Sequence, residues 1–262
     1  MTILNRSIQQ IVPPRPPHET LPTMYDLPFE NAEEPGLPDE FHYLQPQLLS
    51  ATLRIAQYGE ADIFSVGDMN LYYDARHTAW YKRPDWFAVV GVPRLYESRD
   101  MRLSYVVWQE GVSPFVVVEL ISPGTEKEDL GQTERGEDGI PTKWEVYEQI
   151  LRVPYYVVFD RYSNNLRAFQ LVGGHYQQMG VAKLGVPITE WDLCLGLWQG
   201  CYQGIERSWL RWYKADGDLI LTDSEQLEAS EERAAAAEQQ AIEAKQRAEA
   251  LAAKLRDLGV DP

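Results

Sequence analysis

Short apolar runs separated by turn residues occupy the middle of the chain, and this pattern predicts a β-sheet. Between residues 61 and 120, the runs ADIFSV, NLYYD, DWFAVVGV, LSYVVWQEG and PFVVVEL have the length and the β-branched or aromatic content of strands. The last run is apolar at consecutive positions, which indicates a strand covered on both faces. Further on, YYVVFD predicts a strand and the sequence around Gly173-Gly174 predicts a hairpin, while CLGLWQGCYQGI and WLRWYKADGDLI add late strands.

Two helical patterns accompany these strands. Residues 141–154 contain a T-x-x-E capping box, formed by Thr142 and Glu145, ahead of an apolar stripe. An earlier pattern predicts a helix that starts near Pro46 and runs to Tyr58, because proline is tolerated in the first turn of a helix. Strands and helices in this order predict an α/β fold with a mixed sheet core flanked by helices.

Both ends of the chain differ from its middle, which suggests three parts. Residues 1–38 are rich in proline and predict an extended N-terminal arm, partly disordered or wrapped on the surface. Residues 39–221 carry the strands and helices of the main domain, and residues 222–262 form a helical tail.

Apolar or small residues recur in the tail in alternating steps of four and three, as along the a/d seam of a coiled coil. The seam positions are Leu227, Ser230, Ala234, Ala237, Ala241, Ala244, Ala248, Leu251, Leu255 and Leu258. One interpretation is a contact with another chain, in a homo-oligomer or with a partner protein. The other is a solvated single helix of high intrinsic propensity.

The net charge of −16 restricts the classes of function. From Asp223 onward ten acidic residues stand against five basic ones, so the tail carries −5 and the rest of the chain −11. A protein that binds nucleic acid unaided usually has a basic footprint. Any nucleic-acid function must therefore account for an acidic body.

Localisation is expected to be cytoplasmic. No run of 18 apolar residues predicts a membrane span, and the N-terminus lacks an apolar signal-peptide core. The two cysteines, Cys194 and Cys201, have no common zinc or redox spacing.

Two acidic residues stand at the ends of apolar strands, where an unpaired charge is costly. Asp85 opens DWFAVVGV and Glu119 closes PFVVVEL. If these strands are antiparallel neighbours, the two carboxylates meet at one end of a buried sheet. Oxygen ligands suit Mg²⁺ or Mn²⁺, and the backbone carbonyl of Leu120 supplies a third ligand. The alternative is a salt-bridged carboxylate at a strand end.

A lysine begins the inward face of the helix predicted after these strands. Lys143, Val146, Tyr147 and Ile150 follow the i, i+3, i+4, i+7 spacing of one helix face. A cation in the first turn of a helix is disfavoured by the helix dipole, so an anionic partner is expected. Lys143 is either a surface lysine whose stem covers apolar residues or a cation directed at a phosphate and an attacking water.

Three segments together resemble a known family. RPDWFAVVGVP, VVVELISPGTEKEDL and KWEVYEQILRVPYYVVFD are similar to the Uma family of putative restriction endonucleases, within the PD-(D/E)XK nuclease superfamily. The resemblance spans roughly residues 37–213. It implies a restriction-endonuclease-like fold, a divalent metal and a DNA substrate.

The resemblance also implies roles for individual residues. An Asp and a Glu on adjacent strands bind the metal in that superfamily, which gives Asp85 and Glu119 here. A lysine two residues after the Glu stabilises charge at the scissile phosphate, but this position is Ile121. The similarity to Uma-like proteins implies that Lys143, on the following helix, takes that role.

Other candidates are secondary. Tyr147 either orients the lysine or packs in the core, and Glu40 corresponds by position to an auxiliary acid on the first helix of the superfamily. Glu128 and Asp129 belong to an acidic loop and are expected to be solvated. No zinc-hydrolase, P-loop or nucleophile-elbow motif is present.

The sequence therefore predicts a Mg²⁺- or Mn²⁺-dependent endonuclease acting on DNA, with Asp85, Glu119 and Lys143 as catalytic residues. The competing hypothesis is an interaction module with a nuclease fold and weak or absent catalysis, acting through partner proteins. The acidic body and the isoleucine at position 121 favour that alternative.

Overall fold

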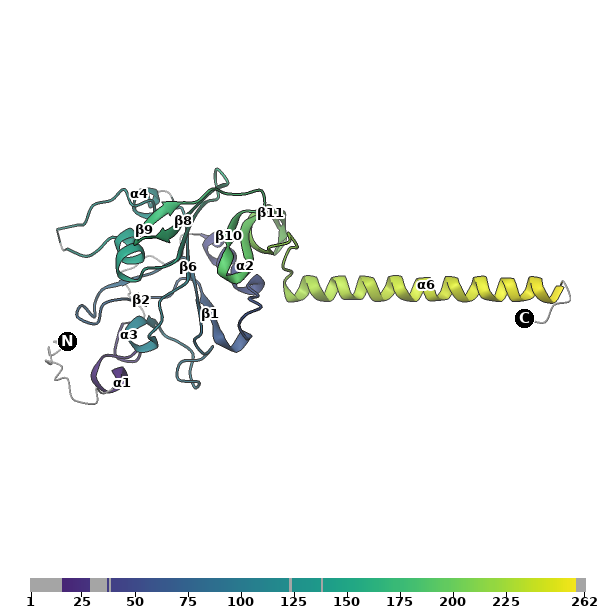
Figure 1. The fold of residues 1–262 in the computed structure, drawn as a ribbon, viewed down its shortest axis with the longest axis horizontal. Helices are drawn as coiled ribbons and strands as arrows, with labels where there is room; N and C mark the ends of the chain where they lie inside the picture. Colours follow the sequence, from purple (N-terminus) through teal and green to yellow (C-terminus); the bar gives the residue numbers. More distant parts are fainter. Residues whose placement is uncertain (1–15, 29–36, 38, 123, 138, 258–262) are drawn as a thin grey trace. The chain divides into compact units, whose positions relative to one another are not determined.

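The computed structural model describes residues 16–28, 37, 39–122, 124–137 and 139–257. The chain divides into two compact units, Met1–Ile220 and Leu221–Pro262. The predicted fold class is confirmed: the first unit is a mixed α/β domain, and the second contains one long helix (Figure 1). No helix of the described residues is long and apolar enough to cross a bilayer.

The main sheet has six strands in the order β1-β4-β6-β7-β8-β9. Only β6 and β7 are parallel, and the other neighbours are antiparallel. The bounds of these strands are β1 Ile63–Val66, β4 Trp86–Val90, β6 Val116–Leu120, β7 Tyr155–Asp160, β8 Asn165–Val172 and β9 His175–Gln178.

Two smaller sheets complete the domain, in the orders β10-β11-β12 and β3-β2-β5. Their strands are β2 Leu71–Tyr72, β3 Tyr81–Lys82, β5 Tyr105–Val106, β10 Val186–Ile188, β11 Leu193–Tyr202 and β12 Ile205–Lys214. The helical segments are α1 Pro17–Thr20, α2 Glu40–Thr52, η1 Glu60–Asp62, α3 Val107–Glu110, α4 Glu126–Asp129, α5 Lys143–Glu145, the π-helical turn η2 Val146–Ile150, η3 Thr189–Trp191 and α6 Asp223–Asp257.

The central strands contribute alternate residues to two separate cores, because successive side chains of a strand point to opposite faces. Val116, Val118 and Leu120 of β6 enter a core with α2 and β10 to β12. Figure 1 shows α2, β10 and β11 on one side of β6. Val117 packs on the other face with Val146 and the rest of α5 and η2. Both faces of β6 are therefore covered, as its continuous apolar run predicts.

The first long helix differs from its prediction. α2 begins at Glu40, ends at Thr52 and contains Pro46 in its interior, so the predicted start near Pro46 and end at Tyr58 were wrong. The side chain of Asp39 caps the helix by accepting hydrogen bonds from the backbone N–H groups of Phe41 and His42. This N-cap explains why the helix starts ahead of the proline.

Pro46 packs closely on the domain rather than facing solvent. A Cβ added to Gly67 would lie 2.6 Å from Pro46 Cβ and 2.8 Å from the backbone oxygen of Asp85. Only glycine therefore allows the helix and the start of β4 to approach this turn so closely.

The described part of the predicted arm packs on the domain. Residues 16–28 contain one helical turn, and the side chain of Met24 is completely buried. Trp108 Nε1 donates a hydrogen bond to the carbonyl oxygen of Pro22 over 2.9 Å. Residues 1–15, 29–36 and 38 of the arm lie outside the described part of the chain. One further strand prediction was partly wrong: after β5, the segment VWQE forms the helical turn α3.

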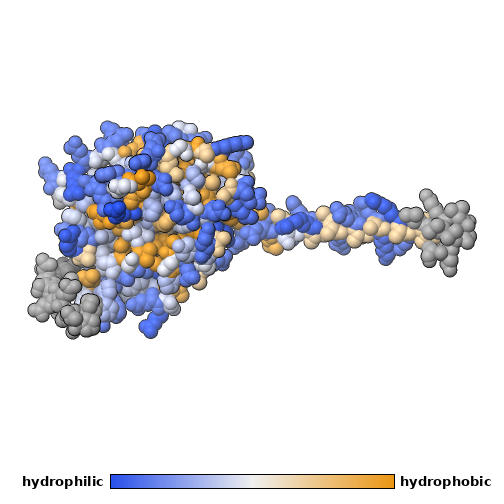
Figure 2. Space-filling view, viewed as in Figure 1, coloured by the Kyte–Doolittle hydropathy of each residue, from blue (hydrophilic) through white to orange (hydrophobic). Residues whose placement is uncertain are grey.

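The tail unit is a single helix with its own cap. Thr222 N donates to Glu225 Oε2 over 2.7 Å and Glu225 N donates to Thr222 Oγ1 over 3.3 Å, which is a capping box. Leu227 is 60% exposed, and Figure 2 shows weakly hydrophobic positions along α6 beside charged ones. Of the predicted seam, Leu258 lies outside the described residues.

The close approach at Gly67 gives the first testable prediction. Gly67→Ala is expected to lower the free energy of unfolding by about 1–3 kcal/mol, because the new methyl group overlaps Pro46 and the Asp85 backbone. Chemical denaturation followed by tryptophan fluorescence measures this change.

Gly59→Ala is the matched control, because its new Cβ would meet only Asp62 Oδ2, at an ordinary 3.5 Å. Equal stability losses in the two variants would show that the approach at Gly67 imposes no steric constraint.

Candidate active site

The pairing of β4 with β6 brings two acidic residues together at one end of the main sheet. The strands are antiparallel and Trp86 pairs with Val118, so Asp85 and Glu119 follow as the next opposing residues. Asp85 N donates to Glu119 Oε2 over 3.4 Å, and Leu120 N donates to Asp85 Oδ2 over 2.6 Å. The antiparallel pairing expected from the sequence is confirmed.

A lysine and a tyrosine from α5 and η2 reach the same carboxylate. Lys143 Nζ donates to Glu119 Oε2 over 3.1 Å, and Tyr147 OH donates to Glu119 Oε1 over 2.9 Å. Glu119 and Tyr147 have no exposed surface. The buried carboxylate is thus held at both oxygens by the helix that covers this face of the sheet.

Lys143 also contacts a third carboxylate. Its Nζ donates to Asp129 Oδ1 over 2.8 Å, and Asp129 is 1% exposed. The expectation that Asp129 is solvated was wrong, because α4 folds its side chain onto a lysine fourteen residues further along the chain. Lys143 therefore bridges Glu119 and Asp129.

The helix that carries Lys143 changes its winding immediately after it. Leu151 N donates to Val146 O over 2.8 Å, an i to i−5 bond that defines the π-helical turn. The extra residue in this turn places Leu151 in the core and leaves Ile150 42% exposed. The predicted inward stripe was therefore right for Val146 and Tyr147 but wrong for Ile150.

Burial governs the electrostatics of this cluster. Burial raises the pKa of Glu119 well above its usual value, opposed by the Lys143 ammonium and reinforced by the carboxylates of Asp85 and Asp129. Burial likewise raises the pKa of Asp85, again against the Lys143 ammonium. Burial alone would lower the pKa of Lys143, but the surrounding carboxylates outweigh it and raise that pKa. One ammonium is thus set among three carboxyl groups, which favours uptake of a proton or a cation.

A buried histidine lies beside the carbonyl predicted as a metal ligand. His42 of α2 is 2% exposed, and its Nε2 lies 3.0 Å from Leu120 O and 3.0 Å from Ser122 Oγ. Its Nδ1 lies 3.0 Å from Asp39 Oδ1, the helix cap. α2 thereby contributes an Asp–His pair to the edge of the site.

The auxiliary role predicted for Glu40 is not supported by its position. Glu40 is exposed at the first turn of α2, whereas His42, two residues later, turns inward to Leu120. The sequence offered one signal for His42, its position three residues after the capping Asp39, which places both on one side of the helix. Asp129 had no such signal, because a short charged turn usually faces solvent.

The donor set fits a small divalent cation. The carboxylates of Asp85 and Glu119 and the carbonyl of Leu120 are hard oxygen ligands of the kind that Mg²⁺ and Mn²⁺ prefer. Asp85 Oδ1 accepts no hydrogen bond from the part of the chain that the structure describes, so it is open to a cation. The described residues contain no group of three or more His, Cys, Asp or Glu side chains arranged for a metal, so water and phosphate oxygens would complete the shell.

Comparison with known proteins identifies related sequences and folds. A sequence model of the Uma2 family, described as "Putative restriction endonuclease", matches residues 16–200, which is more than half of the chain. The crystal structure of a putative nuclease belonging to DUF820 from Anabaena variabilis aligns with a TM-score of 0.37 and 12% identity, over 60% of this chain and 76% of that chain. No functionally curated protein matches the chain.

The raised pKa of Glu119 gives a prediction about stability in the absence of metal. A carboxyl group whose pKa is higher in the folded state than its unfolded value near 4.5 contributes stability below that pH, and the contribution is lost as the pH rises. Glu119→Gln removes the group that takes up this proton, so the variant is expected to lose less stability than the parent between pH 5 and pH 8 in EDTA. Denaturant unfolding from pH 5 to pH 8 measures the difference.

Glu40→Gln is the control, because it removes an exposed acid from α2. If Glu119→Gln lost stability with rising pH as steeply as the parent, Glu119 would not be the group that holds the additional proton.

Proposed function

Since this chain belongs to the Uma2 family, whose members are described as putative restriction endonucleases, we propose that it is a metal-dependent endonuclease that hydrolyses DNA. The observation that supports this most strongly is the convergence of Asp85, Glu119 and Lys143 at one sheet end. Two carboxylates, a carbonyl and an ammonium are the groups required to hold a cation and a phosphodiester together.

The carboxylates and the carbonyl would hold the metal. A bound Mg²⁺ or Mn²⁺ at Asp85, Glu119 and Leu120 O would polarise the phosphodiester and lower the pKa of a bound water. Hydrogen bonds from Tyr147 and Lys143 fix the plane of the Glu119 carboxylate. Tyr147 therefore acts through Glu119 and is a positioning residue.

Lys143 is the group proposed to meet the substrate. An ammonium has three N–H donors, and two of them are directed at Glu119 and Asp129. The third donor remains for a non-bridging oxygen of the scissile phosphate, whose negative charge grows as water attacks. Asp129 keeps the amine at the site and favours its charged form.

The acidic body requires an additional explanation for DNA binding. The chain outside the tail carries a net charge of −11, which repels a polyanion. Cations bound at the site reduce this repulsion locally, and a partner protein with a basic surface would reduce it further. We propose α6 as the element that recruits a second copy or such a partner.

A second candidate function is an interaction module with a nuclease fold and little catalysis. The acidity of the body favours it, as does the engagement of Lys143 by two carboxylates of the protein itself. In this case the Glu119–Lys143–Asp129 cluster would stabilise the fold, and α6 would carry the function.

Cleavage of a supercoiled plasmid tests the endonuclease directly. Protein with Mg²⁺ or Mn²⁺ is expected to convert it to open-circular and linear forms, and EDTA is expected to abolish this. Asp85→Asn and Lys143→Met are each expected to reduce the rate at least ~100-fold, because each removes a group that acts on the phosphodiester.

Lys127→Met is the charge-matched control, because Lys127 is an exposed lysine on α4 without a place in the cluster. Its rate should equal that of the parent. A parent protein that cleaves no faster than Asp85→Asn would favour the interaction module.

Removal of the tail tests the proposed association. The full chain is expected to show a mass above that of one 30.1 kDa protomer in light scattering, and a chain truncated after Leu221 is expected to be monomeric. The cut falls one residue beyond the boundary between the two compact units, so the domain should keep its melting temperature. A monomeric mass for both chains would rule out self-association and leave binding to a different protein.

A further inference from the structure

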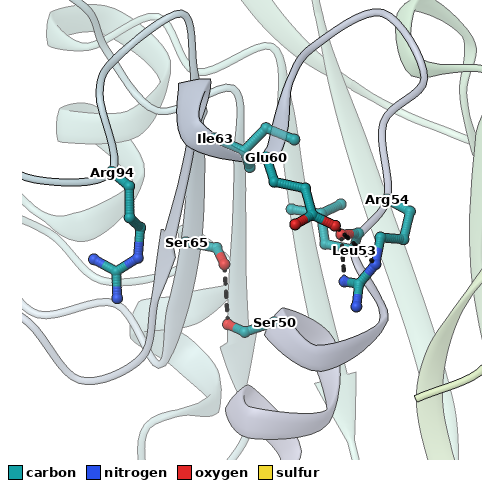
Figure 3. Close-up of a pocket in the computed structure, with 7 residues that line it drawn as sticks. All are labelled: Ser50, Leu53, Arg54, Glu60, Ile63, Ser65 and Arg94. Atoms are coloured by element: carbon teal, nitrogen blue, oxygen red, sulfur yellow. Dashed lines mark hydrogen bonds and ion pairs between the residues drawn. The ribbon is translucent and has the colours of Figure 1, made fainter. Parts of the chain in front are cut away.

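A pocket outside the carboxylate cluster combines arginine and serine side chains. It has a volume of about 260 Å³ and lies among the C-terminal half of α2, η1, β1 and the loop after β4. Figure 3 shows Arg94 and Arg54 on opposite sides of two serines. The lining residues are Ser50, Leu53, Arg54, Glu60, Ile63, Ser65 and Arg94.

The two serines leave a hydroxyl hydrogen for a ligand. Ser50 Oγ accepts the indole N–H of Trp86 over 2.9 Å and the hydroxyl of Ser65 over 3.1 Å. Both lone pairs of Ser50 Oγ are thus engaged, and its own hydrogen is available to an acceptor in the pocket. The hydroxyl pair therefore presents a donor.

The guanidinium groups add positive charge. Arg94 makes no ion pair within the described part of the chain, and its guanidinium lies 5.7 Å from the ring centroid of Phe64. Arg54 Nη1 donates to Leu53 O over 3.0 Å, and its Nε lies 3.7 Å from Glu60 Oε1, whose side chain is 87% exposed, so this ion pair leaves most of the guanidinium charge uncompensated. Arginine and serine donors around one cavity are suited to the oxygens of a phosphate group.

A second cavity adjoins this pocket and reaches His42. It has a volume of about 220 Å³ and shares Ser50 with the first. Its other lining residues are Leu37, His42, Tyr43, Pro46, Gln47, Gly67 and Asp68, the last of which is paired with Arg83. His42 is the residue whose Nε2 lies 3.0 Å from Leu120 O. Ser50 lies eight residues beyond His42, roughly 12 Å along the helix axis. The two cavities therefore meet at Ser50 on α2, and the second reaches the histidine that contacts the proposed metal ligand Leu120 O.

We propose that the pocket of Ser50, Ser65, Arg54 and Arg94 binds a phosphate of the substrate strand, one or more nucleotides away from the scissile phosphate. The identity of the ligand as a nucleic-acid strand rests on the proposed function, whereas the affinity for phosphate follows from the donors of the pocket. Tyr43 lines the second cavity and is 55% exposed, so its ring offers a surface on which a base of the same strand can stack. The two arginines of the pocket give an acidic protein a local cationic contact with its substrate.

Fluorescence anisotropy of a short labelled single-stranded DNA, with the full chain in EDTA to prevent hydrolysis, tests the proposal. Arg94→Met is expected to weaken binding several-fold and to reduce the slope of log K against log salt by roughly 0.7, the value for one lost phosphate contact. Arg99→Met, which removes an exposed arginine outside the pocket, should change neither quantity. Equal affinity and slope for Arg94→Met and the parent would overturn the proposal.

Inorganic phosphate distinguishes a strand from a free ion. If phosphate raises the melting temperature of the parent but not of Arg94→Met, and DNA binding is unaffected by the substitution, the site binds free phosphate and the strand assignment is overturned. Because binding is measured without metal, the outcome is separate from catalysis. Binding that depends on Arg94, without plasmid cleavage, would support the phosphate pocket and contradict the endonuclease. Plasmid cleavage with binding that does not depend on Arg94 would support the endonuclease and overturn the pocket.

Discussion

The contact between Glu119 and Lys143 is the interaction on which the domain and its proposed chemistry both depend. A fully buried carboxylate is costly unless a cation and hydrogen bonds compensate it. Here the compensation comes from an α-helical turn that covers the sheet and from the phenol of Tyr147. The position of α5 and η2 on β6 is therefore fixed by charge as well as by apolar packing.

The same contact explains why Ile121 is compatible with the site. Ile121 packs in the core beneath α5 and η2, on the same face of the sheet as Glu119. A lysine at this position would have to leave that core to reach solvent or phosphate. With the ammonium supplied by Lys143, the end of β6 keeps its apolar packing and the site keeps its cation.

The sequence predicts the parts of this arrangement that depend on local pattern. The apolar run ending in Glu119, the strand starting at Asp85 and the capping box before Lys143 each carry their own signal. Asp129 and His42 could not be found in this way, because each joins the site only through tertiary contacts with distant residues. Ile150 was predicted to face inward for a different reason. The prediction assumed the 3.6-residue period of an α-helix, and the π-helical turn η2 changes that period.

Excess negative charge at the site connects the fold with its proposed function. Asp85, Glu119 and Asp129 outnumber the single ammonium, and burial raises the pKa of the first two, so the cluster is suited to receive a cation. Diffraction from crystals soaked in Mn²⁺ tests this most directly. We expect an anomalous peak about 2.1 Å from oxygens of Asp85, Glu119 and Leu120, with Lys143 still bonded to Asp129. Soaked crystals without a peak there, and with Lys143 still bridging Glu119 and Asp129, would contradict a metal-dependent active site.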